Sequence, residues 1–289
     1  MRAGLALAAM ACCGVVSTLA ACGALFPDPE PVQERRTANV VEGQTQVRVD
    51  ADGLRLVLSQ ADAVRAVFSL KRLRFGRVAS FEPNRNYDPS TFKTSPVKGL
   101  RWFSVTSAKV INSATGGPAL GAWDPQDHAH VLLETADDAG AVGDRWLLRI
   151  ARRGHGTVSC DLELADPALR KAHSEESVKS MYVVTELSIE SPKDERYYGL
   201  GELFDTPQHR GRTRLMQIVA DLDYESGYNE AHVPIPLLVG SRGWGLFVES
   251  RRPALFDVAE TDSERVRVAF NAAGLRFHLI AADHPLDVP

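Results

Sequence analysis

The feature that most constrains this chain is an alternation of apolar and polar residues that starts at about residue 47. Successive side chains of a strand point to opposite faces, so a period of two marks a strand with one buried face. The alternation, together with short apolar runs, recurs in segments 54–59, 131–133, 146–150, 181–189, 266–270 and 275–279. Turn-forming clusters separate these segments. The pattern predicts an all-β fold, an antiparallel β-sandwich, in which segment 166–180 could hold one short helix.

Composition narrows the class of protein. Hydrophobic residues make up 44% of the 289 residues and charged residues 24%, which excludes a disordered chain and a multi-span membrane protein. The formal net charge of -4 gives no reason to expect a nucleic-acid partner. A large sandwich followed by a complete (β/α)₈ barrel does not fit, because the barrel alone needs roughly 250 residues.

The first residues have the pattern of a secretory signal peptide. Arg2 supplies a positive charge, and an uncharged run of small and apolar residues follows from Ala3 to Ala21. The run closes with Leu19-Ala20-Ala21-Cys22, which resembles the lipobox of bacterial lipoproteins. That resemblance implies cleavage before Cys22 and acylation of its thiol. The alternative is an ordinary signal peptide in which the cysteine stands by chance.

The lipobox resemblance also implies a location. Two or three acyl chains would anchor the protein stably to a membrane of the bacterial cell envelope. Gly23 stands where an aspartate would signal retention in the inner membrane, which favours the outer membrane. Cys12 and Cys13 would leave with the signal peptide. Cys160 then remains, and its place in an alternating strand predicts a small buried hydrophobe rather than a nucleophile.

One region carries much more specific information than the rest. Segment 197–204 reads Tyr-Tyr-Gly-Leu-Gly-Glu-Leu-Phe, and its two glycines predict a backbone bend or a close approach that a Cβ atom would block. An Arg-Gly pair follows at 210–211, then a loop rich in Asp, Tyr and Gly at 220–230. Segments 233–239 and 242–249 predict a hairpin with Gly243 in its turn.

This ordered set of motifs resembles the N-terminal β-sandwich domain of glycoside hydrolase family 31, which contains α-glucosidases and α-xylosidases. The resemblance is strong over residues 181–289. It implies a galactose mutarotase-like supersandwich and a carbohydrate, an α-glycoside, as partner. The signal pattern, the lipobox and the proline-rich segment after it give a signal peptide at 1–21, and lipidated Cys22 and a flexible tether at 22–46. The alternation and the family resemblance give the sandwich at 47–282 and the start of a linker to a barrel at 283–289.

The resemblance further implies that the chemistry lies elsewhere. The catalytic aspartates of the family belong to its barrel, and a retaining glycosidase needs two carboxyl groups about 5–5.5 Å apart. No carboxylate of this chain matches either role, so we expect no catalytic residue and no glycosidase activity from this polypeptide alone. A barrel domain on a neighbouring chain would be the partner. We expect no cofactor.

The family places one aspartate of a sandwich loop near the sugar. Asp221 is the best match for this substrate-binding residue and Asp223 the next. The family pattern has Asn two positions earlier, where this chain has Val219, so a solvated turn aspartate is an equally good interpretation.

Several other residues have both a functional interpretation and a simpler structural one. His128 and His130 share one face of a strand, but zinc needs three or four ligands and no companion motif is visible, so we expect no metal site. Glu202 could contact a ligand, and a structural role is favoured. The four tryptophans could stack on sugar rings, but we expect them to pack in the core or between the sheets instead. They are Trp102, Trp123, Trp146 and Trp244.

Two other functions remain open. The chain could be a stand-alone surface lipoprotein that binds carbohydrate. A mutarotase-type epimerase ranks last, because it needs a His/Glu pair in a cleft and the histidines show no such arrangement in the sequence. If a barrel docks here, we expect an apolar face around Tyr197, Phe204 and loop 221–230.

Overall fold

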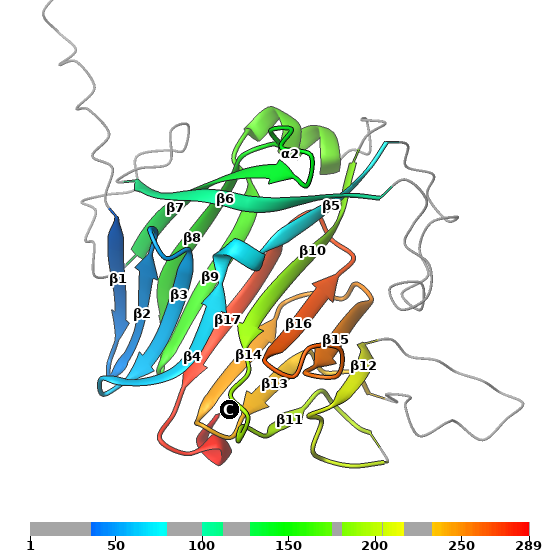
Figure 1. Cartoon of the computed structure of the whole chain (residues 1–289). Coiled ribbons are helices and arrows are strands. Elements are labelled where there is room, and N and C mark those ends of the chain that lie inside the picture. Colours follow the sequence, from blue (N-terminus) through cyan, green and yellow to red (C-terminus); the bar gives the residue numbers. More distant parts are fainter. Residues whose placement is uncertain are drawn as a thin grey trace, which may run out of the picture. The chain divides into compact units, whose positions relative to one another are not determined.

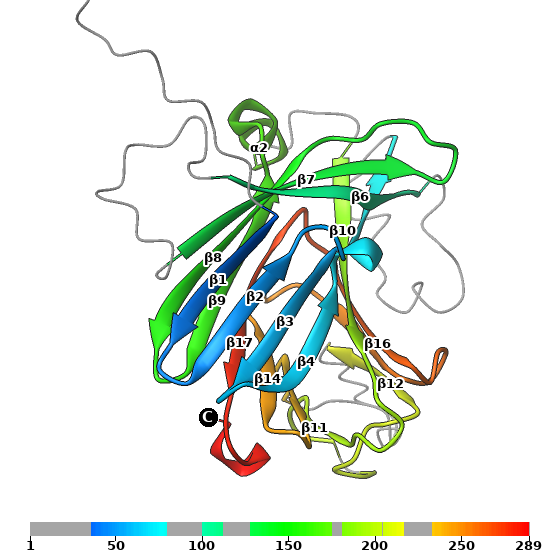
Figure 2. The same ribbon diagram turned by 60° about the vertical axis from the view of Figure 1, so that its left-hand side comes forward.

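The protein is described by a computed structural model that covers residues 36–79, 100–111, 128–174, 181–203, 205–216 and 233–288. All of these residues belong to the unit Gln33–Pro289. They form seventeen strands joined in one antiparallel network that folds into two packed layers (Figure 1). Figure 2 shows β1 to β4 lying across β8, β9 and β17, and these strands contact one another between the layers. The predicted all-β antiparallel sandwich is therefore confirmed.

The first half of the chain forms two runs of neighbouring strands. β1 to β4 make one run, and β5 to β9 make the other, each strand pairing with the next. Their bounds are β1 (Thr37–Glu42), β2 (Thr45–Asp50), β3 (Arg55–Gln60), β4 (Ala63–Ser69), the 3₁₀ turn η1 (Leu70–Arg72), β5 (Arg74–Val78), β6 (Arg101–Ile111), β7 (His128–Asp137), β8 (Trp146–Gly154) and β9 (Thr157–Leu164).

The second half closes the sandwich around one shared strand. β10 pairs with β4, β5 and β16, and β17 joins β9 to β14. The bounds are α2 (Pro167–Ser174), β10 (Met181–Glu190), β11 (Tyr197–Gly199), β12 (Arg212–Met216), β13 (Leu237–Gly240), β14 (Trp244–Val248), β15 (Ala254–Val258), β16 (Arg265–Phe270), β17 (Leu275–Ala281) and the 3₁₀ turn η2 (Pro285–Asp287).

The sheet begins earlier than the sequence predicted. Residues 37–46, assigned to the flexible tether, instead form β1 and the start of β2, which pair in register from Thr37–Asp50 to Glu42–Thr45. Val40 is fully buried, and Gly43 takes φ +60° in the tight turn between the strands. The boundary at residue 46 was wrong. The strand β1 has few apolar residues, so its alternation is weak, and it follows the proline-rich stretch at 27–31.

The interior is filled by aromatic and branched side chains from both layers. Trp146 and Trp244 are fully buried, which confirms packing as the role of these two tryptophans. Trp146 stacks on Phe75 at 3.7 Å between ring centroids. Trp102 lies under the guanidinium of Arg74 at 4.3 Å, and Trp123 lies outside the described residues. Cys160 is fully buried as predicted, and burial raises the pKa of its thiol.

The short helix α2 also lies where the sequence indicated. The carboxylate of Asp166 accepts a hydrogen bond from the backbone N–H of Ala168 at 2.8 Å, and so caps the start of α2. Among the described residues, no helix has both the length and the apolar character needed to cross a membrane. Cys22 and the predicted signal peptide lie outside the described residues.

Candidate functional site

The glycine motif bends the chain sharply at the end of β11. Three successive residues have positive φ, with Gly199 at +95°, Leu200 at +63° and Gly201 at +90°. A Cβ atom on Gly199 would collide with the carbonyl oxygen of Leu237, and one on Gly201 would collide with that of Val233. The predicted close approach of backbones is therefore confirmed. The bend joins the motif to β13 and, through a bridge between Glu202 and Val233, to the residue that follows segment 217–232.

A buried acid and a tryptophan fix the hairpin β13–β14 beside this bend. The two strands pair from Leu237–Phe247 to Gly240–Trp244, and Gly243 has φ +79° in the turn, as the sequence predicted. Nε1 of Trp244 donates a hydrogen bond to Glu195 at 2.5 Å. Glu195 is only 1% exposed, and this burial raises the pKa of its carboxyl group.

A second buried network lies under the motif and links Asp205, His209 and Arg214. Arg214 donates from Nη2 to both carboxylate oxygens of Asp205 at 2.8 Å, and its Nε donates to Nδ1 of His209 at 3.3 Å. Nε2 of His209 donates to the carbonyl oxygen of Gly199 at 2.9 Å. This pattern assigns a neutral imidazole, and burial lowers the pKa of His209.

The charge balance of this network keeps Asp205 ionised. Burial disfavours its charged form, but the hydrogen bonds from Arg214 and the charge of Arg212 hold the pKa of Asp205 below its usual range. The network borders a hollow of about 380 Å³, also lined by Tyr198 and Glu202. Since its polar atoms are committed to one another, it serves to position the motif against β12, the strand that leads into segment 217–232.

Some of the predicted site residues lie outside the described part of the chain, and the others differ in their exposure. Asp221, Asp223 and Phe204 lie outside the described residues. Glu202 is exposed, and its backbone forms the bridge to Val233, so a structural role is visible at the main chain. Tyr197 is fully buried, and its hydroxyl donates to Ser191 Oγ at 2.6 Å, so its side chain does not form part of a surface.

The predicted histidine pair lies on one face of β7. The rings of His128 and His130 are 5.7 Å apart between centroids. Burial lowers the pKa of His130, and the nearby His128 lowers it further. The described residues contain no group of three or more His, Cys, Asp or Glu side chains arranged to hold a metal ion.

An apolar hollow lies on the outward face of β13, β14 and β17, and we call it the outer groove. It has a volume of about 600 Å³ and is lined by Ile235, Leu237, Phe247 and Ile280, with Arg153, His155 and His278 at its polar side. The side chain of Ile235 is 45% exposed, and Val233 beside it is 51% exposed. Outward positions on a solvated sheet are normally polar, so this run of apolar residues is a candidate interaction surface.

One histidine of the outer groove has a carboxylate partner. Nε2 of His278 lies 3.9 Å from Oε1 of Glu249, and its ring stacks on Phe247. Burial lowers the pKa of His278, and Glu249 opposes that shift. An epimerase needs its acid and base on two sides of the sugar. A separation of 3.9 Å leaves no room for a sugar ring between these two groups.

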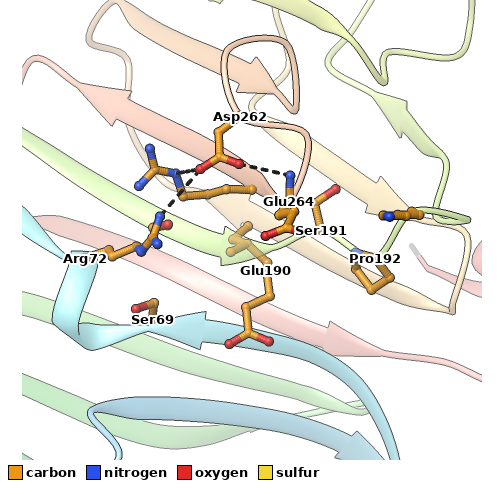
Figure 3. Close-up of a pocket in the computed structure, with 11 residues that line it drawn as sticks. Ser69, Arg72, Glu190, Ser191, Pro192, Asp262 and Glu264 are labelled. Atoms are coloured by element: carbon orange, nitrogen blue, oxygen red, sulfur yellow. Dashed lines mark hydrogen bonds and ion pairs between the residues drawn. The ribbon is translucent and has the colours of Figure 1, made fainter.

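A third hollow, which we call the polar cleft, opens between η1, the end of β10 and the β15–β16 turn (Figure 3). Its volume is about 410 Å³. Figure 3 shows Arg72 and Ser69 on one side, Ser191 and Pro192 on the other, and Asp262 facing them. Asp262 forms ion pairs with Arg72 at 3.6 Å and with Arg265 at 3.4 Å. Sequence reasoning missed this cleft, because three distant segments build it.

Comparison with known proteins identifies a family for most of the chain. A family model described as the glycosyl hydrolase 31 N-terminal galactose mutarotase-like domain matches residues 20–257. The alpha-xylosidase XylQ of Lactiplantibacillus pentosus is 29% identical over 97 residues, which are 33% of this chain and 12% of that enzyme. The chain therefore matches about an eighth of that curated relative.

Solved structures with a similar chain course include two enzymes. A GH31 family sulfoquinovosidase from E. rectale aligns with 82% of this chain and 32% of its own, at 14% identity and a TM-score of 0.47. A GH31 dextranase from Flavobacterium johnsoniae aligns with 88% of this chain and 27% of its own, at 15% identity and a TM-score of 0.34.

Proposed function

The chain belongs to the family of glycosyl hydrolase 31 N-terminal galactose mutarotase-like domains, and from this we propose that it is the N-terminal sandwich of an α-glycosidase that docks on a separate catalytic domain. The observation that carries the proposal is the family match over residues 20–257. In this role the sandwich supplies no reacting group. It stabilises the catalytic domain and shapes the entrance to the sugar site.

The outer groove is the face that we assign to docking. Phe247, Leu237 and Ile280 present apolar side chains on the outward face of the sheet, next to the exposed Val233 and Ile235. Burying such side chains against another domain contributes about 25 cal/mol per Å² of apolar area. Arg153 and His278 at the polar side of the groove suit a partner surface with hydrogen-bond acceptors at its rim.

The glycine motif supports the second part of the role. Its bend and the Arg214–Asp205–His209 network hold both ends of segment 217–232, through β12 on one side and Val233 on the other. That segment contains Asp221 and Asp223, the residues expected from the family to approach the sugar. A rigid base for a substrate-contacting loop reduces the entropy that binding costs.

The docking proposal is tested with one substitution and its matched control. The catalytic barrel domain that the proposal requires is produced as a separate polypeptide and mixed with the chain. We expect Phe247→Asp to weaken the complex at least tenfold in a titration, because it buries a charge in an apolar interface. Val64→Asp, at a 55% exposed position of β4, should leave the affinity unchanged.

Activity supplies the second measurement. The chain alone should not hydrolyse 4-nitrophenyl α-D-xylopyranoside, whereas the complex should. Ordinary turnover by the chain alone, or equal effects of the two substitutions on complex formation, would overturn the proposal.

We further propose that the protein is a lipoprotein of the bacterial cell envelope, held at the outer membrane by acyl chains on Cys22. The support is the lipobox sequence and the proline-rich segment that follows it. The protein should incorporate labelled palmitate and sediment with membranes. Cys22→Ser should abolish labelling, and Cys160→Ser should not, because the Cys160 thiol is buried. Labelling that survives Cys22→Ser would exclude this anchor.

A second candidate function is a stand-alone surface protein that binds carbohydrate. The observation that favours it is the polar cleft, which is complete within the described residues and needs no partner domain.

A further inference from the structure

One edge of the sandwich ends in a strand with a single partner. Pairing runs in the order β1, β2, β3, β4, β10, β16, β15 and β12, and Figure 1 shows β1 as the outermost strand on the left. Among the described residues β1 pairs with β2 alone. We propose that the open edge of β1 binds the same edge of a second copy of this chain, antiparallel and about a two-fold axis. The inference goes beyond the proposed function, because it concerns another surface and another partner.

The backbone groups of every second residue of β1 point to the open edge. The carbonyl oxygen of Arg36 accepts from the N–H of Ala51, the residue that follows β2. In an antiparallel pair, alternate residues turn their N–H and C=O toward the same neighbouring strand. Because Arg36 faces β2, the backbone groups of Thr37, Asn39 and Val41 face away from it. Within the described residues these three form no hydrogen bond beyond β2.

The strand lacks the features that usually protect an edge from pairing. It contains no proline and no lysine, and its pairing with β2 runs without a bulge. No charged residue stands between Arg36 and Glu42. At the other end of the same run, β12 carries Arg212 and Arg214. An unprotected, regular edge is a template for another strand, and a second copy brings an identical one.

The sequence of β1 is complementary to itself in one register. With Asn39 opposite the partner's Asn39, Arg36 stands opposite the partner's Glu42, and the reverse pair forms at the other end. Opposite charges placed directly across two strands stabilise their pairing. Ala38 stands opposite the partner's Val40 in this register. Val40 is fully buried and Ala38 packs against the core, so this apolar pair extends the core face of the sheet.

The neighbouring registers lose the match. A slide of two residues in one direction sets Arg36 opposite the partner's Val40, and in the other direction it sets Glu42 opposite the partner's Ala38. A slide of one residue places backbone groups that face the edge opposite groups that face β2. The charges therefore select the register centred on Asn39.

The arginine can exchange its present contact at little cost. Arg36 lies 3.4 Å from Asp52, and the two side chains are 83% and 65% exposed. Exposed ion pairs of this kind contribute little to stability. A contact made by one strand edge is small, so we expect a weak dimer that forms at high micromolar concentration.

Engineered cysteines test the contact and its register together. In the full chain, Cys12→Ser, Cys13→Ser and Cys22→Ser leave the buried Cys160 as the remaining natural cysteine. In this background Asn39→Cys should form a disulfide-linked dimer under mild oxidation, read by non-reducing electrophoresis. Directly opposite Cα atoms of such a pair lie about 5.5 Å apart, within the range that a disulfide spans.

Thr37→Cys is the matched control, because Thr37 is exposed on the same face of the same strand. In the proposed register it stands opposite the partner's Val41, so two Thr37→Cys chains hold their thiols about 14 Å apart along the strand. Alone, this variant should give much less dimer than Asn39→Cys. A mixture of Thr37→Cys and Val41→Cys chains should give dimer where neither variant does so alone.

A charge exchange tests the end pairs. Arg36→Glu or Glu42→Arg should slow formation of the Asn39→Cys dimer about fivefold or more, and the double variant should restore the rate. Asp52→Asn removes the present contact of Arg36 and should leave the rate unchanged. Phe247→Asp, in the outer groove, should also leave it unchanged, so failure of the docking proposal and failure of this one remain distinguishable.

Three outcomes would overturn the inference. The first is the absence of an Asn39→Cys dimer at high micromolar concentration. The second is equal cross-linking of Asn39→Cys and Thr37→Cys, which marks random collision or aggregation. The third is a double charge variant that stays as slow as the single ones.

Discussion

Gly201 shows at the scale of a single residue how the end of the sandwich is built. Its backbone has φ +90°, and a Cβ atom there would collide with the carbonyl oxygen of Val233. We expect Gly201→Ala to lower the free energy of unfolding by about 3 kcal/mol, because backbone strain and a steric clash act together. Chemical denaturation with a fluorescence readout measures this change.

Gly140 provides the control for that substitution. Its φ is similar, at +81°, but no atom lies within 4 Å of the position where a Cβ would stand. Gly140→Ala should therefore cost only the backbone strain, about 1 kcal/mol. Equal losses in the two variants would mean that the approach of Val233 does not determine the role of Gly201.

The residues of the motif were predictable to different degrees. The two glycines stand in a short segment between strands, and their need for an unusual backbone can be read from the sequence. The burial of Arg214 could not, because arginine is nearly always exposed and only the fold brings Asp205 and His209 to it. Alternation in β12 indicates which residues share a face, but not that one of these faces contains a buried charge.

At the scale of elements, Glu195 fastens the hairpin β13–β14 to the loop before β11. Its carboxylate accepts from Trp244, whose indole is fully buried in the core. Burial raises the pKa of Glu195 in the folded state above its value in the unfolded chain. The folded state therefore binds more protons, so the contribution of this group is greatest at pH values below the unfolded pKa. It is lost as the pH rises through the folded pKa.

Glu195→Gln tests this dependence, because the amide keeps an acceptor for Trp244 but does not titrate. We expect the melting temperature of the natural protein, relative to that of the variant, to fall as the pH is raised from 4 to 8. Thermal unfolding followed by circular dichroism gives both curves. Glu202→Gln, at an exposed position of the same motif, is the control. Its melting temperature should follow that of the natural protein over the same pH range. A difference that rises with pH would contradict the assignment.

The elements themselves were predictable where their signals were local. The hairpin turn at Gly243 and the short helix after Asp166 follow from turn and capping residues close in sequence. The start of the sheet was not predictable, because β1 has few apolar residues. It is identified as a strand mainly by its pairing with β2. A weak strand is recognised through its neighbour in space.

At the scale of the whole molecule, the sequence predicted two layers of antiparallel strands but not their partners. β10 pairs with β4 and β5, which come about a hundred residues earlier, and with β16, which comes about eighty residues later. The polar cleft depends on this long-range pairing, since it joins the end of β10 to η1 and to the β15–β16 turn. Such a site has no continuous sequence motif and becomes visible only in the assembled sandwich.

Because β10 pairs with three strands, it connects the strands of the first half of the chain to those of the second half. Neither the early strands nor the late ones have a complete set of neighbours without it, so we expect that neither half of the chain folds independently. Any attempt to dissect this sandwich for crystallography or engineering must keep Met181–Glu190 with both flanks, and a split site is better placed in a surface turn such as the one at Gly140.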